Sequence, residues 1–150
     1  MNYNNLLFDY VTRTQKNLEF IEKAIEEDPE KEVFEVTQLI NSLLGLIVFP
    51  FEKFKYRIPR KPLSELENEG WVLPHVEGHF PQAPDLYELM HYLRNAVAHF
   101  NIVFTTDEHE TINGIRVSNI YRGNKRWEAS FSIIGLRDNV NRFVDLLHAI

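Results

Sequence analysis

The chain has 150 residues, a formal net charge of −6, 44% hydrophobic residues and no cysteine. This length fits one domain with a real core, and the composition excludes disorder, disulfide bonds and thiolate metal sites. The acidic balance excludes a surface that attracts nucleic acid everywhere, and the absence of long apolar runs and the polar start MNYNN predict a cytoplasmic protein without membrane span or signal peptide.

The first two predicted elements are helices. Apolar residues recur at helical spacing over residues 3–27, and a second helix is expected from Asp28-Pro29 to about Phe49, where Pro50 ends or kinks it. The stretch LINSLLGLIVF is apolar on nearly every side, which predicts a central buried helix. Asn41 interrupts this stretch, and its amide is either satisfied inside a bundle, or faces solvent at its edge, or binds substrate in a cleft shared with His99.

Residues 52–62, EKFKYRIPRKP, form the most basic segment of this acidic chain. Cations that alternate with aromatic side chains are typical of surfaces that bind single-stranded nucleic acid. The alternative is a solvated loop without a binding role. The candidate substrate-binding cations of this segment are Lys53, Lys55, Arg57 and Arg60.

A short helix is expected at residues 63–68, followed by a long loop at residues 70–83 that contains glycine and proline. His75 and His79 lie in this loop, but their spacing is not that of a His-Glu-x-x-His helix, and a glycine-containing loop fixes no ligand geometry. We therefore expect no metal site and no cofactor.

Residues 85–102, DLYELMHYLRNAVAHFNI, predict a long amphipathic helix with Asp85 at its start. One face of this helix carries polar side chains, among them Arg94, Asn95 and His99. The opposite face is an apolar stripe that consists of Leu86, Leu89, Met90, Leu93, Val97 and Phe100.

Beyond this helix the apolar residues recur at the two-residue spacing of strands. Residues 102–106, 114–121 and 126–134 predict a three-stranded meander with a hairpin turn at Gly123-Asn124. Gly135 closes it, and residues 136–150 predict a final helix. The predicted fold class is therefore mainly α, a single domain in which an antiparallel helical bundle over residues 3–102 carries a small accessory hairpin or meander and helix over residues 103–150. The inward residues of the final helix are Leu136, Val140, Phe143, Val144 and Leu147.

Residues 93–100, LRNAVAHF, resemble the signature of the HEPN superfamily, in which an arginine is followed after four to six residues by a histidine. A polar residue often follows the arginine, as Asn95 does here. The upstream LINSLLGLIVFP resembles stand-alone bacterial HEPN proteins. Arg142 and His148 satisfy the loose spacing as well, but an apolar residue follows that arginine. One HEPN branch has a tyrosine two residues after the histidine, which a nucleotidyltransferase partner modifies; Asn101 stands there, so this regulation is not expected.

The resemblance implies a metal-independent endoribonuclease that cuts RNA by attack of the 2′-hydroxyl and leaves a cyclic phosphate. His99 exchanges protons near neutral pH in this interpretation, and Arg94 holds phosphate oxygens. Asn95 orients His99 or binds the substrate. Tyr92 is a further candidate substrate-binding residue.

Helical geometry predicts a homodimer. Arg94 and His99 diverge by ~140° on one straight helix, whereas Asn95 and His99 share a side. A second copy across a two-fold axis brings both sets of groups into one cleft, and the small Ala98 permits close approach. The predicted function is an RNase acting on tRNA or mRNA, as a toxin with an antitoxin partner or as a phage-defence effector. The alternatives are a catalytically silent HEPN module that binds RNA or nucleotide, and a structural or partner-binding protein.

Overall fold

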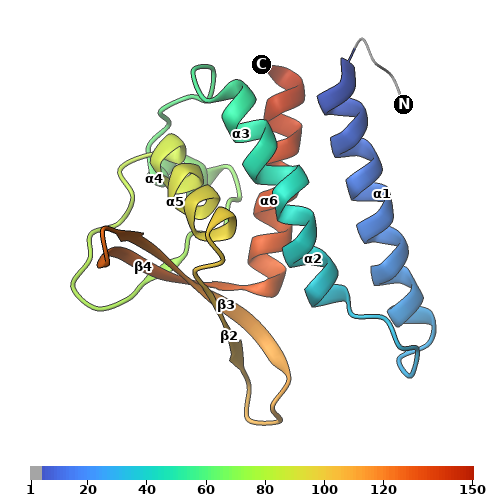
Figure 1. Ribbon diagram of the computed structural model, residues 1–150. Coiled ribbons are helices and arrows are strands. Elements are labelled where there is room, and N and C mark those ends of the chain that lie inside the picture. The colour runs from blue at the N-terminus through green and yellow to red at the C-terminus, as the bar shows by residue number, and fades with distance from the viewer. Residues whose placement is uncertain (1–4) are drawn as a thin grey trace.

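The computed structural model describes residues 5–150, which form a group of helices beside one antiparallel sheet (Figure 1). The helical elements are α1 (Leu6–Glu27), α2 (Glu35–Leu43), the π-helical turn η2 (Leu44–Val48), α3 (Phe49–Phe54), α4 (Leu63–Asn68), α5 (Leu86–Ala98) and α6 (Ile133–Ala149). The strands are β1 (His75–Val76), β2 (Ile102–Thr106), β3 (Ile112–Tyr121) and β4 (Asn124–Ser132), in the sheet order β1-β4-β3-β2. Among these residues, no helix combines the length and the apolar character that crossing a membrane requires.

The expected mainly α fold class is wrong, because the four-stranded antiparallel sheet is a substantial layer of the fold. Burial alternates along β3 and β4, which gives the sheet one apolar face that a second layer must cover. Both α5 and α6 pack against β3, so the sheet and the helices share one core. The buried residues that the sheet contributes include Ile115, Val117, Trp127, Ala129 and Phe131.

The first predicted helix is confirmed as α1 over its described part, while residues 3 and 4, like most of the polar start, lie outside the described residues. The second helix begins at Glu35, not at Asp28-Pro29. Asp28 instead ends α1, since its N–H donates to the carbonyl of Ala24 and its side chain accepts from the N–H of Glu30. An aspartate followed by proline was compatible with either role.

Pro50 does not end the second helical segment, which continues through η2 into α3. A proline ring clashes with the carbonyl four residues earlier in a regular α-helix, and the wider π-helical turn just before Pro50 relieves that clash. The segment is buried on the side that packs against α5. The predicted burial of residues 39–49 is confirmed except at Asn41, Leu44 and Phe49, which are exposed.

Helix α5 begins as predicted, with the carboxylate of Asp85 accepting a hydrogen bond from the N–H of Glu88 at 2.9 Å. It ends at Ala98 rather than near residue 102, and His99 is its C-cap. The apolar stripe is buried except for Phe100, whose side chain is 65% exposed.

The predicted meander is confirmed as β2, β3 and β4, and β1 from the predicted loop extends it by pairing with β4. The turn between β3 and β4 lies at Arg122-Gly123, one residue earlier than predicted; both have positive φ (49° and 77°), as a two-residue type I′ turn requires. Helix α6 begins at Ile133 because Ser132 caps it by accepting from the N–H of Gly135. Its five predicted inward residues are all buried.

Candidate functional site

The C-terminal end of α5 holds His99 in a fixed backbone conformation. The N–H of Phe100 donates to the carbonyl of Val97 (3.1 Å), and the N–H of Asn101 donates to that of Ala96 (2.8 Å). These two bonds form a Schellman motif, with Phe100 at a φ of 53° in the position that glycine usually occupies. The carbonyl of Asn101 in turn accepts from Ser118 on β3 (3.0 Å). The imidazole of His99 is exposed on a backbone that the sheet holds in place.

A chain of side-chain hydrogen bonds runs from β3 to Arg94. Asn119 on β3 donates from Nδ2 to the carbonyl of Tyr92 (2.7 Å), and its Oδ1 accepts from Nδ2 of Asn95 (3.2 Å). Asn95 then accepts with Oδ1 from Nη1 of Arg94 (2.8 Å). Each amide is therefore oriented by a donor on one side and an acceptor on the other. Asn119 is only 9% exposed, so the sheet fixes this chain from inside the protein.

The guanidinium of Arg94 lies between α5 and α3. Its Nη2 is 2.7 Å from Oε1 of Glu52, an acidic partner that the sequence did not indicate. The Nε of Arg94 is buried and has no hydrogen-bond partner within residues 5–150. A buried N–H without an acceptor is rare in folded proteins, and the Nε of Arg142 is in the same state.

A hollow of about 200 Å³ lies beside the end of α5. It brings Asn95 and His99 together with residues of β3 and β4, whereas Arg94 does not line it. The lining residues are Asn95, His99, Asn101, Asn119, Ile120, Tyr121 and Arg126. Asn119, Ile120, Tyr121 and Arg126 were not predicted from the sequence as site residues. The only signal for two of them was the basic and aromatic run YRGNKR at 121–126, which contains Tyr121 and Arg126.

None of the six predicted substrate-binding residues lines this hollow. Tyr92 is half-buried with its ring 4.9 Å from that of Trp127, so it supports the junction of α5 with the sheet. Burial, reinforced by the charges of Glu88 and Asp85, raises the pKa of its phenol. Asn41 is exposed on α2 and does not line the hollow.

The basic segment 52–62 is largely neutralised by contacts within the chain. Arg60 lies 3.2 Å from Asp85 and 3.5 Å from Glu88, and its hydrogen bond to Asp85 raises its pKa. Lys55 lies 3.7 Å from the carboxylate of Glu52. Arg57 donates to the backbone oxygen of Ile150, and Lys53 is exposed at the edge of a groove between α1 and α3.

His75, His79 and His148 form no comparable site. His75 and His79 are exposed, and residues 5–150 contain no cluster of three or more side chains suited to a metal ion. Arg142 and His148, the second pair with motif-like spacing, are engaged separately. Arg142 donates to the carbonyl of Glu69 (3.0 Å), and the His148 ring stacks on Phe8 at 4.6 Å.

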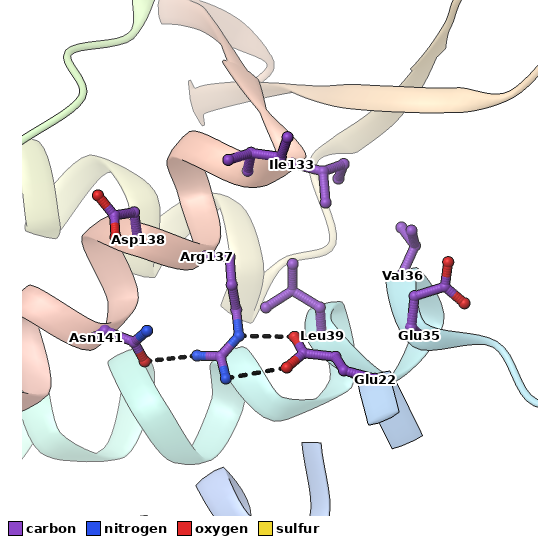
Figure 2. Close-up of a pocket in the computed structure, with 9 residues that line it drawn as sticks. Glu22, Glu35, Val36, Leu39, Ile133, Arg137, Asp138 and Asn141 are labelled. Carbon is purple, nitrogen blue, oxygen red and sulfur yellow. Dashed lines mark hydrogen bonds and ion pairs between the residues drawn. The ribbon is translucent and has the colours of Figure 1, made fainter. Parts of the chain in front are cut away.

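A second arginine cluster lies between α1 and α6, in a hollow of about 330 Å³ (Figure 2). Arg137 donates from Nε and Nη2 to the two carboxylate oxygens of Glu22 (2.7 and 3.3 Å), and from Nη1 to Oδ1 of Asn141 (2.6 Å). The lining includes no histidine. This cluster holds two helices together and offers no group for proton transfer.

An Arg-x4-His pair at the end of a helix that packs on an apolar partner helix agrees with a HEPN domain. A family model described as HEPN pEK499 p136 matches residues 1–150. The chain therefore belongs to this HEPN family, and the match includes the strands and the last helix, which the resemblance of residues 3–102 did not cover. No curated protein and no solved structure gives a significant match.

Proposed function

We propose that this HEPN protein is a metal-independent endoribonuclease that uses Arg94, Asn95 and His99 at a homodimer interface. The observation that carries the proposal is the exposed imidazole of His99, which stands on a fixed helix end and shares a hollow with the ordered amide of Asn95. Histidine is the side chain best suited to proton transfer near pH 7. The hollow beside it is lined by three asparagines and by Arg126, which can donate hydrogen bonds to phosphate oxygens.

The proposed reaction needs one proton acceptor, one proton donor and a cation. His99 takes the proton of the 2′-hydroxyl, whose oxygen attacks the phosphorus. The bond from phosphorus to the 5′-oxygen breaks, and the leaving oxygen takes a proton from water; the hydroxide that remains takes the proton that His99 accepted. The products are a 2′,3′-cyclic phosphate and a 5′-hydroxyl. Arg94 stabilises the charge on the phosphate oxygens through its planar donors.

The position of the Arg94 guanidinium outside the hollow supports a site shared by two copies. Within one chain its guanidinium contacts Glu52 and does not line the hollow that contains His99. Exposed apolar side chains lie on both sides of the polar groups, next to His99 in sequence and along the groove that Glu52 lines. Exposed apolar side chains that gather beside polar groups mark surfaces at which proteins associate. These exposed residues are Phe100 and Val103 on one side and Leu6, Tyr10 and Phe49 on the other.

The direct test is incubation of the purified protein with total RNA in the presence of EDTA. We expect cleavage that leaves cyclic phosphate ends, that is lost in His99→Ala and that is retained in His148→Ala. The second variant is a matched control, because His148 is also exposed and belongs to the other motif-like pair. Equal cleavage by the wild type and His99→Ala, or cleavage only with added metal, would contradict the proposal.

A second candidate function is RNA or nucleotide binding without cleavage. The observation in its favour is the ion pair of Arg94 with Glu52, which occupies the guanidinium within one chain. Binding without cleavage in the same assay would support it.

We further propose that the ribonuclease acts as a toxin or phage-defence effector on tRNA or mRNA, with an antitoxin protein as its partner. Growth arrest on expression that disappears with Arg94→Ala is the expected result. Growth arrest that persists in this variant would contradict the toxin role.

A further inference from the structure

We propose that single-stranded RNA is bound by the tip of the β3–β4 hairpin, defined here as residues 121–126, and not by the basic segment 52–62. This inference rests on the proposed function for the nature of the ligand. It assigns the surface along which the RNA strand reaches His99, and it gives the sheet a role in the site.

The hairpin tip is a basic surface whose arginines are free of acidic partners. It contains Arg122, Lys125 and Arg126 and no acidic residue. Lys125 lies 2.5 Å from the carboxylate of Glu128. Neither arginine has an acidic partner among the described residues. In a protein with a net charge of −6, such a pair gives a local field that attracts phosphate.

A β-bulge directs Arg126 toward the hollow. Ile120 pairs with Lys125 and Asn119 pairs with Trp127, so Arg126 is an extra residue on β4 without a partner on β3. Bulges of this kind bend the strand and re-aim a side chain, and they are frequent beside active sites. Arg126 accordingly lines the same hollow as His99. Its guanidinium can therefore bind a phosphate one nucleotide away from the scissile bond.

Tyr121 provides the aromatic surface that an unpaired base needs. Its side chain is 57% exposed, and it also lines the hollow. The guanidinium carbons of Arg122 and Arg126 lie 5.2 and 6.0 Å from its ring centroid. An exposed aromatic ring flanked by arginines binds single strands by stacking on a base and pairing with the adjacent phosphates. The base next to the cleaved bond is thus expected on Tyr121.

The contrast with segment 52–62 supports this assignment. Arg60 is held by two carboxylates and Lys55 by one, and Arg57 donates to a backbone oxygen. Counterion release by phosphate binding requires cations that are not already neutralised within the protein. The hairpin tip offers two such cations next to the hollow, whereas the two that segment 52–62 offers, Lys53 and Arg57, do not line it.

The test measures RNA binding in His99→Ala, so that cleavage does not interfere. The probe is a fluorescein-labelled single-stranded oligouridylate, and the readout is anisotropy over a range of salt concentrations. Arg122→Gln/Arg126→Gln is compared with the matched double variant Lys53→Gln/Arg60→Gln, which removes the same charge. We expect the hairpin variant to bind about 10-fold more weakly. The slope of the logarithm of the binding constant against the logarithm of the salt concentration should become smaller by about 1.4, or ~0.7 for each lost phosphate contact.

The control variant is expected to bind within about twofold of its parent, since its cations make no phosphate contact in this account. Tyr121→Leu should weaken binding and Tyr121→Phe should preserve it, because the base stacks on the ring and not on the hydroxyl. Thermal melts establish that the variants are folded. An equal or larger loss in the control variant, or no binding by the His99→Ala parent, overturns the inference. If the wild type binds RNA through the hairpin tip but never cuts it, the nuclease proposal fails and the binding surface stands.

Discussion

Arg94 and Arg137 have the same kinds of partner and different surroundings. Each arginine lies 2.7 Å from a glutamate oxygen and donates to the oxygen of one asparagine side chain. Arg137 uses Nε, Nη1 and Nη2, and its carboxylate partner is bidentate (Figure 2). Arg94 leaves its Nε buried without a partner among residues 5–150.

The difference shows how one residue type serves two purposes. Arg137 is a structural clamp between two helices, because its Nε and both of its Nη atoms each donate to a side-chain oxygen. Arg94 contacts its partners through Nη1 and Nη2 only, and Asn95 and His99, which follow it on the same helix, line a hollow. Variants of the Arg94 cluster should therefore affect RNA cleavage or binding, and matched variants of the Arg137 cluster should not.

The largest expected effect is on cleavage by His99→Gln. Removal of a general acid–base group lowers the rate by ~10²–10⁴. Because the side chain is exposed and its backbone hydrogen bonds remain, the melting temperature should not change. The measurements are single-turnover cleavage and a thermal melt, and a drop in both would indicate a structural role instead.

Arg94→Lys is expected to lower cleavage by ~10², because a lysine cannot present the planar pair of donors to a phosphate. Arg137→Lys should leave cleavage unchanged and lower the free energy of unfolding by ~1–3 kcal/mol, through loss of hydrogen bonds to a partly buried carboxylate. Urea unfolding and cleavage assays on both variants separate the two roles. Equal cleavage defects in both variants would contradict the assignment of a functional role to Arg94 and a structural role to Arg137.

Asn119→Ala is expected to affect both stability and cleavage. It removes a donor to Tyr92 and an acceptor for Asn95, which lowers the free energy of unfolding by ~1–3 kcal/mol. Cleavage should fall as well, with kcat affected more than KM, because Asn95 loses its orientation. The control is Asn139→Ala on α6, a buried asparagine that makes two hydrogen bonds to the backbone of Val72. This control should lose similar stability and keep its cleavage rate per folded molecule; a parallel loss of rate would argue against a positioning role for Asn119.

The smallest expected effect concerns the carboxylates of the two clusters. Glu52→Gln removes the negative charge beside Arg94, and a partly exposed pair of this kind is worth about 1 kcal/mol or less, so RNA should bind about 2- to 5-fold more tightly. Glu22→Gln should leave RNA affinity unchanged. Anisotropy with the labelled single strand in the His99→Ala background checks both; weaker binding by Glu52→Gln would mean that the carboxylate organises Arg94 instead of competing with the phosphate.

Local sequence signals predicted much of the helical structure and the motif itself. Asp85 as a helix cap, the stripe from Leu86 to Val97 and the three strands of the meander follow from short-range spacing, and all three are present. The position of Arg94 and His99 near the end of one helix follows from the same signals. The residue at which that helix ends could not be predicted in this way, because Phe100 adopts a positive φ that its residue type disfavours.

The remaining features depend on contacts between distant segments. Pro50 lies within a continuous helical path because a π-helical turn precedes it, and no residue pattern announces such a turn. The integration of the sheet into the core depends on α5 and α6 packing on β3. Asn119 reaches Asn95 only through that packing, and Arg126 reaches the hollow only because of a bulge. The contribution of Asn119 and Arg126 to the site therefore could not be predicted from the local spacing of residues.

The central claim is that the complete site combines Arg94 of one copy with His99 of another. The most direct measurement mixes purified Arg94→Ala and His99→Ala proteins, each inactive alone, and follows RNA cleavage after subunit exchange. A shared site is restored once in each mixed dimer, so we expect about a quarter of the wild-type activity in an equimolar mixture. Activity that stays at the level of the separate variants, although mass spectrometry shows mixed dimers, would contradict the claim.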